Sequence, residues 1–150
     1  MKILMLMVYA MSQDVALCCC ALFAGGACYV SLVEQPTILR ARKDLTGAYI
    51  LLAQPRPAVF ETAFAAIGAL AGIMAGISGS AGWWLAGGLL LAAAFVFRLA
   101  MVGPQTRRIL EIGLHGDLDD AHEHLERLEK LHAVQSLLGL GALFTFIFGT

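Results

Sequence analysis

The chain has 150 residues, 59% hydrophobic and only 14% charged, with a formal net charge of −1. Soluble domains typically carry roughly 25% charged residues, so this composition is that of a membrane protein and argues against an ordinary soluble enzyme. The near-neutral charge gives no basis for nucleic-acid binding. The length suits a single domain, which we take as residues 1–150.

The chain starts with Met1 and Lys2, followed by a short apolar segment that resembles a signal sequence. No convincing cleavage site follows it, and polar residues at 12–14 interrupt the apolar run. Three interpretations therefore stay open. The natural start is Met1, or it is Met11, or the segment is a signal that is cleaved.

Four apolar runs follow, at about residues 15–33, 58–78, 81–102 and 131–148. A bilayer core needs roughly 20 apolar residues as helix. None of the runs shows the alternation of a barrel strand, and helices satisfy their own backbone groups in lipid. The sequence therefore predicts an all-α protein, an integral membrane antiparallel four-helix bundle.

The two long connections, residues 34–57 and 103–130, hold most of the basic residues. Pro36 is expected to end the first helix, because proline breaks helices. Each connection has four Lys or Arg residues, whereas Lys2 alone lies on the other side. The positive-inside rule then places both connections in the cytoplasm and both termini outside, in what we interpret as a bacterial inner membrane.

The fourth span is expected to begin as a cytoplasmic extension. Asp117 is positioned to cap a helix at its start. Small, apolar and polar residues then recur at alternating spacings of three and four, which predicts one continuous helix face. The residues of this face are Leu118, Ala121, Leu125, Leu128, His132, Gln135, Gly139 and Ala142.

Small residues form stripes on the spans. Gly68, Gly72 and Gly76 recur every four residues in the second span. Such stripes let helices approach closely in lipid, where dispersion drives association. Trp83 and Trp84 are expected to anchor the third helix at the outer membrane interface.

Polar residues lie on the same faces as these stripes. Glu34, Glu61, Arg98, His132 and Gln135 each follow the inner face of a span, close to its cytoplasmic end. Helical phase thus predicts that they converge in a pocket. Intramembrane ionisable groups are costly and often functional. Each has an alternative interpretation. Glu34 could mark a helix terminus, and Glu61 could complement the helix dipole. Arg98 could extend to the membrane interface, and His132 could be an interfacial residue with a backbone partner.

No metal or cofactor site is predicted. His122 and His124 flank Glu123 at a spacing that does not place two ligands on one helix face, so we interpret them as solvated surface. A single inner-face histidine gives no bis-His haem site. The four cysteines all lie in the first span and are interpreted as small apolar residues.

Three stretches together resemble a known family. They are "AGGACYVSLVEQP" after residue 23, "VGPQTRRI" after residue 101 and "LEKLHAVQSLLGLGAL" after residue 127. This ordered set resembles the anthrone-oxygenase-like family of small four-helix membrane proteins. Glu34, Pro36, Pro104, Arg108 and His132 match its pattern. Thr106, Leu128 and Gln135 stand where the family commonly has Asn, Trp and Arg.

The resemblance implies oxidation of a polycyclic aromatic or quinol-like substrate by dioxygen, without a bound cofactor. His132 would act as the base that removes an acidic C–H proton, because a histidine of reference pKa about 6.5 titrates near working pH. Glu34 would orient it, and Arg98 would stabilise the substrate oxygen anion. Glu61, Arg108 and Gln135 would complete the substrate-binding site.

Two non-enzymatic hypotheses stand beside this one. In the first, the chain is a small accessory subunit or packing partner of a larger membrane complex, or a homo-oligomer. Its buried polar residues would then fix helix register. The second, a transporter subunit, is weaker because the spans show no internal repeat. The partners predicted in all cases include the lipid bilayer.

Overall fold

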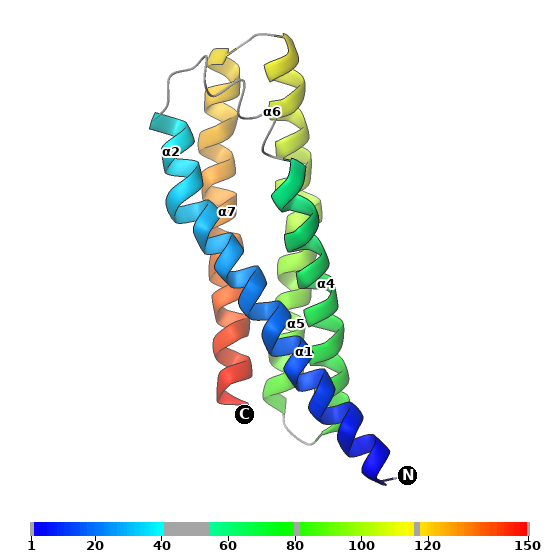
Figure 1. The fold of residues 1–150 in the computed structure, drawn as a ribbon. Helices are drawn as coiled ribbons and strands as arrows, with labels where there is room; N and C mark the ends of the chain where they lie inside the picture. The colour runs from blue at the N-terminus through cyan, green and yellow to red at the C-terminus, as the bar shows by residue number, and fades with distance from the viewer. Residues whose placement is uncertain (1, 41–54, 80–81, 116–117, 150) are drawn as a thin grey trace.

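The computed structural model describes residues 2–40, 55–79, 82–115 and 118–149, and every regular element in these ranges is helical. The elements form four rods (Figure 1). The first rod joins α1 (Lys2–Tyr29), η1 (Val30–Glu34) and α2 (Gln35–Arg40). The others are α4 (Pro55–Ser78), then α5 (Gly82–Phe97) with η2 (Arg98–Val102) and α6 (Gly103–His115), and finally α7 (Leu118–Phe148).

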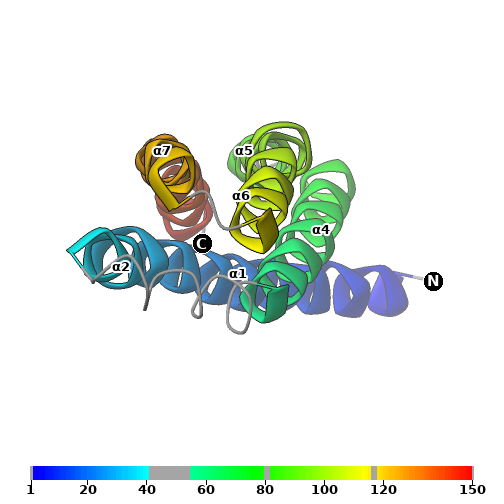
Figure 2. The same cartoon turned by 90° about the horizontal axis from the view of Figure 1, so that it is seen from above.

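The rods form an antiparallel bundle, in which the first rod crosses the other three obliquely (Figure 2). In cyclic order α1 packs on α4, α4 on α5, α5 on α7 and α7 on α1. This places α4 diagonally opposite α7. Both chain ends lie at one end of the bundle, and α2, α6 and the start of α7 lie at the other, here termed the α6 end (Figure 1). The predicted all-α antiparallel four-helix bundle is confirmed.

Each rod contains a helix long and apolar enough to cross a bilayer: Leu6–Arg40, Val59–Ser78, Gly82–Ile112 and His122–Phe148. Large apolar side chains such as Leu32, Ile67 and Leu137 point outward, with 74%, 50% and 69% of their surface exposed. Outward-facing apolar side chains on helices of this length are solvated by lipid. The chain is therefore an integral membrane protein, and its apolar helices contact the bilayer.

Glycines hold α4 and α5 together near the end with the termini. A Cβ atom at Gly76 would lie 2.5 Å from the backbone nitrogen of Leu85. One at Gly88 would lie 2.6 Å from the backbone nitrogen of Ile73. Neither position tolerates a side chain without moving a helix backbone. The predicted glycine stripe on the second span thus serves close helix packing.

The position of Trp84 contradicts the prediction that this residue anchors the third helix at the membrane interface. Its side chain is fully buried and stacks on Phe146, with ring centroids 5.1 Å apart. Its Nε1 donates a hydrogen bond to the Gly149 carbonyl, at 2.9 Å. Trp83 is 59% exposed, as expected of an interfacial anchor. Trp84 is instead a core residue, because the next helix position faces α7 rather than lipid.

Two π-helical turns interrupt the first and third rods. In η1 the N–H of Gln35 donates to the carbonyl of Val30, and in η2 the N–H of Gly103 donates to the carbonyl of Arg98. A proline follows each turn at the same offset, at Pro36 and Pro104. Proline cannot donate to the preceding turn, and its ring clashes with a carbonyl there. Widening each turn by one residue accommodates the ring.

The helix therefore continues through Pro36 to Arg40, which corrects the expectation that proline ends it there. The rest of the first connection, residues 41–54, lies outside the described ranges, as does the predicted cap at Asp117. In α7 the predicted inner face is confirmed where side chains are described. Its buried residues are Leu125, Leu128, His132, Gln135, Gly139 and Ala142.

Candidate functional site

Three buried polar residues from three helices meet on the axis of the bundle. Arg98 and Glu61 are each 6% exposed, and Gln135 is fully buried. Nη1 of Arg98 forms an ion pair with Oε2 of Glu61 and donates a second hydrogen bond to Oε1 of Gln135, at 3.2 Å. Nε2 of Gln135 donates to the same Glu61 oxygen, at 3.1 Å. We term these residues the polar cluster.

The polar cluster is held by the helices around it. Glu61 on α4 and Gln135 on α7 reach each other across the diagonal of the bundle. Arg98 opens the π-helical turn η2, and its Nε donates to Oγ1 of Thr62, at 3.0 Å. The guanidinium is thus bonded to three side chains from α4 and α7. Pairing of this kind, through Nε and Nη1, is what a charge needs in order to remain in an apolar interior.

Glu34 lies at the end of the other π-helical turn and lines a pocket between the first rod and α4. The pocket has a volume of about 260 Å³. Glu61 lines the same pocket, so two acidic residues border one space. We term this space the acidic pocket. It is lined by Leu22, Gly26, Tyr29, Val30, Glu34, Phe60, Glu61 and Phe64.

The acidic pocket opens on the lipid-facing surface. Three of its wall residues, Leu22, Tyr29 and Phe60, are 56%, 59% and 66% exposed. Gly26 contributes no side chain to the wall. A Cβ atom there would lie 3.6 Å from Oε1 of Glu61, so this oxygen faces the space beside Gly26.

His132 lies behind the polar cluster, three residues before Gln135 on α7. Its side chain is 5% exposed. Among the described residues, its Nδ1 has no hydrogen-bond partner, and the same holds for Oε1 of Gln35. Buried polar atoms are normally hydrogen-bonded, and these two lie on elements, α2 and α7, that contact each other.

Arg108 lies away from the polar cluster. It is exposed on α6, ten residues beyond Arg98, or about 15 Å along the helix at 1.5 Å per residue. His124 also differs from the expected solvated surface. Nε2 of the buried Gln105 lies 2.6 Å from His124 Nδ1 and donates to the His124 carbonyl at 3.3 Å. This contact joins α6 to α7.

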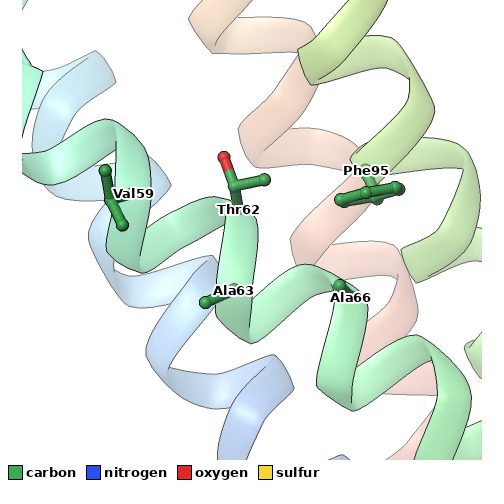
Figure 3. A pocket seen from close by; sticks show the side chains of 5 residues that line it. All are labelled: Val59, Thr62, Ala63, Ala66 and Phe95. Atoms are coloured by element: carbon green, nitrogen blue, oxygen red, sulfur yellow. The ribbon is translucent and has the colours of Figure 1, made fainter.

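A second space lies on the other side of α4 (Figure 3). It has a volume of about 460 Å³ and is lined by Val59, Thr62, Ala63, Ala66 and Phe95. Thr62 is the one polar residue among the described residues of its wall, and the Thr62 hydroxyl accepts the bond from Arg98. The groove is larger than the acidic pocket, but none of its described lining residues is ionisable.

Several residues of the acidic pocket were not found from the sequence. Gly26, Tyr29, Phe60 and Phe64 read as ordinary membrane-helix residues, because each lies in a long apolar run. Thr62 lies outside this pocket and bonds Arg98. Its position directly after Glu61 was the one feature of the sequence that could have pointed to it. The residues singled out in the sequence are placed as follows: Glu61, Arg98 and Gln135 in the polar cluster, Glu34 in the acidic pocket, His132 behind the cluster and Arg108 on the surface.

Within the described part of the chain, no three His, Cys, Asp or Glu side chains come together in a way that could hold a metal ion. Comparisons of the chain with protein-family models, with curated proteins and with solved structures found no match.

Proposed function

We propose that this protein takes a flat hydrophobic molecule from the bilayer into the acidic pocket, removes a proton from it, and lets dioxygen oxidise the resulting anion. The observation that carries the proposal is the placement of Glu34 and Glu61 in one aromatic-walled pocket open to lipid. Ligand pockets are typically apolar with a few convergent polar groups. The resemblance to anthrone-oxygenase-like proteins supports the reaction type.

The chemistry needs a base and little else. A carboxylate takes a proton from a ring methylene that is acidified by a neighbouring carbonyl. The electron-rich anion then reacts with dioxygen. One oxygen atom becomes the new ring carbonyl, and the other leaves as water with the two methylene hydrogens. The four electrons lost by the carbon reduce the dioxygen completely.

The geometry favours Glu34 over His132 as the first proton acceptor. Glu34 lines the acidic pocket, whereas His132 lies on α7, across the polar cluster. In the proposed mechanism Arg98 holds Glu61 in place and offsets negative charge beside the pocket. His132, with its Nδ1 available in the interior, would accept a proton in a later step. Arg108 would act only at the surface of the α6 end.

The test uses purified protein in lipid nanodiscs with anthracen-9(10H)-one, the parent anthrone. We expect oxygen uptake equal to the anthrone consumed, with anthraquinone as product. Glu34→Gln keeps the shape of the side chain but removes the base, so the rate should fall by about 10²-fold or more. Glu111→Gln, on the exposed face of α6, is the matched control. Equal rates for the wild type and E34Q would refute the proposal.

The polar cluster favours one second candidate, a non-enzymatic subunit of a larger membrane complex. Its ion pair and hydrogen bonds bring three helices into one register, which a purely structural role also explains. Stoichiometric partner chains after gentle detergent extraction, with no anthrone oxidation, would establish this alternative.

We also infer that the α6 end faces the cytoplasm, because the two long connections, which join helices at that end, carry eight of the ten Lys and Arg residues of the sequence. The chain with Arg108→Cys, in a background without its native cysteines, should react with a membrane-impermeant maleimide only after the cells are opened. Labelling of intact cells would reverse the orientation.

A further inference from the structure

We infer that the ligand of the acidic pocket is an amphiphile: an aromatic ring system that carries one hydrocarbon chain. The ring lies in the pocket. The chain leaves between Leu22 and Phe60 and runs along the lipid-facing side of the contact between α1 and α4, toward the end with the termini. This inference rests on the proposed function, because it names the class of molecule that the pocket holds. It concerns where each part of the ligand lies, so it can be tested without turnover.

The size of the acidic pocket favours a ligand that is only partly enclosed. Its volume is about 260 Å³. Pockets that bury most of a drug-sized ligand typically measure roughly 300–1,000 Å³. The acidic pocket therefore holds a small ring system, and any long substituent must lie outside it. The surroundings at that point are lipid, since the rim residues Leu22, Tyr29 and Phe60 belong to the lipid-facing surface.

The lining of the pocket changes from polar to apolar along the first rod. Glu34 lies at the α6 end of the lining, and Leu22 lies at the opposite end, twelve residues earlier. Gly26, beside Oε1 of Glu61, lies between them. Twelve residues correspond to about 18 Å of helix at 1.5 Å per residue. Polarity thus falls from the α6 end toward the middle of the membrane, as it does along a lipid molecule.

Exposed apolar side chains continue from the rim of the pocket toward the end with the termini. We term them the apolar track, and they are Met11, Val15 and Leu22 on α1 and Phe60, Ile67 and Met74 on α4. Between 41% and 66% of the surface of each is exposed. Residues seven apart share a helix face, so Val15 follows Leu22, and Ile67 follows Phe60. Because Leu22 and Phe60 line one pocket, both halves of the track lie on the same side of the contact between α1 and α4.

A chain on the apolar track fixes how the ring enters the pocket. The chain leaves on the side of Leu22 and Phe60, so another edge of the ring faces Glu61 and Glu34. In the proposed reaction that edge carries the acidified methylene, because a carboxylate takes its proton. A chain on an outer ring, away from the methylene, is therefore accommodated. A chain on the methylene itself would be directed against the inner wall of the pocket.

The test uses the whole protein in lipid nanodiscs, without dioxygen, and two photoreactive probes. Both probes are anthrone with a dodecyl chain that ends in a diazirine. The chain is attached at ring position 2 in one probe and at the methylene, position 10, in the other. After illumination, mass spectrometry of peptides locates the chain end. We expect the first probe to label residues 11–22 and 67–74, and excess 2-dodecylanthrone to remove this labelling. The second probe should give only labelling that excess ligand does not remove.

Two variants check that the ring occupies the acidic pocket. Gly26→Leu places a side chain beside Oε1 of Glu61 and should abolish the labelling that excess ligand removes. Gly25→Leu is the matched control, since a Cβ atom there meets no atom within 4 Å, and it should label as the wild type does. The position of the label on the wild-type protein decides the inference even where a variant folds poorly.

The inference is overturned by chain ends that label the α6 end, by labelling that excess ligand does not remove, or by equal removable labelling from both probes. The failure of the proposed function is a separate result. If anthrone is not oxidised while the labelling pattern holds, the oxygenase is refuted and the amphiphile site stands. Oxidation of anthrone that depends on Glu34, without any removable labelling, would do the reverse.

Discussion

Arg98 and Glu61 form a buried ion pair at the centre of a membrane bundle, and both are hydrogen-bonded to Gln135 on a third helix. Gln135 and Glu61 lie on helices that are diagonally opposite, so their bond crosses the axis. The pair therefore does more than neutralise two charges. It links α4, α7 and the α5–η2–α6 rod at the level where the acidic pocket begins.

Removing one member of this pair should cost stability. Arg98→Met leaves Glu61 buried without its cation, and breaking a buried pair in this way typically costs about 3–5 kcal/mol. The double variant Arg98→Met with Glu61→Leu should recover much of the loss, because no unpaired charge remains. Thermal unfolding in a mild detergent checks both. Arg107→Met, on the exposed face of α6, is the control, and an Arg98→Met protein as stable as that control would contradict the ion pair.

Glycine-to-alanine substitutions should distinguish the effect of close helix packing from the effect of intrinsic helix propensity. Gly76→Ala and Gly88→Ala each place a methyl group within 3 Å of backbone on the facing helix, so α4 and α5 must separate. Overpacking of this kind typically costs about 1–3 kcal/mol. Gly141→Ala meets nothing within 4 Å and should be neutral or stabilising. Unfolding midpoints in SDS titrations give the comparison, and equal midpoints for all three variants would refute the close approach.

The π-helical turn η1 predicts that two single-residue deletions in the first rod differ in how much they damage folding. Deleting Leu32 removes the extra residue of the turn, so both flanking segments keep their faces. Deleting Ala21, in the regular part of α1, rotates one flank by about 100° and exposes buried residues. We expect the Leu32 deletion to fold, with a cost of about 3 kcal/mol from Pro36 in a regular helix. Size-exclusion profiles and unfolding midpoints would show this, and equal damage by both deletions would argue against the π-helical turn.

The two tryptophans should report different surroundings. Trp84 is fully buried against Phe146, whereas Trp83 is 59% exposed. Brominated lipids quench fluorescence by contact, so they should quench the Trp84→Phe variant, which retains Trp83, much more than Trp83→Phe. The reverse order would mean that Trp84 faces lipid.

The helices and the inner-face residues were predictable, because apolar length and helical phase are local properties. Helical phase alone predicted that Glu61, Arg98 and Gln135 face the interior of the bundle. The burial of Trp84 was missed, since the general preference of tryptophan for membrane interfaces was given more weight than its phase. The helix beyond Pro36 was missed because the expectation that proline ends a helix does not allow for a π-helical turn that accommodates the proline ring. The acidic pocket depends on the absence of a side chain at Gly26 and on how α1 crosses α4, and neither is visible in one helix alone.

The glycine contacts of α4 and α5 have a practical consequence. They lie near the end with the termini, whereas the acidic pocket lies toward the α6 end, with walls that include the lipid-facing Phe60 and the partly buried Phe64. Substitutions at these two walls therefore leave the tightest helix contacts untouched. The lipid-facing wall of the acidic pocket at Phe60 can therefore be varied without changing the close glycine contacts that join α4 and α5.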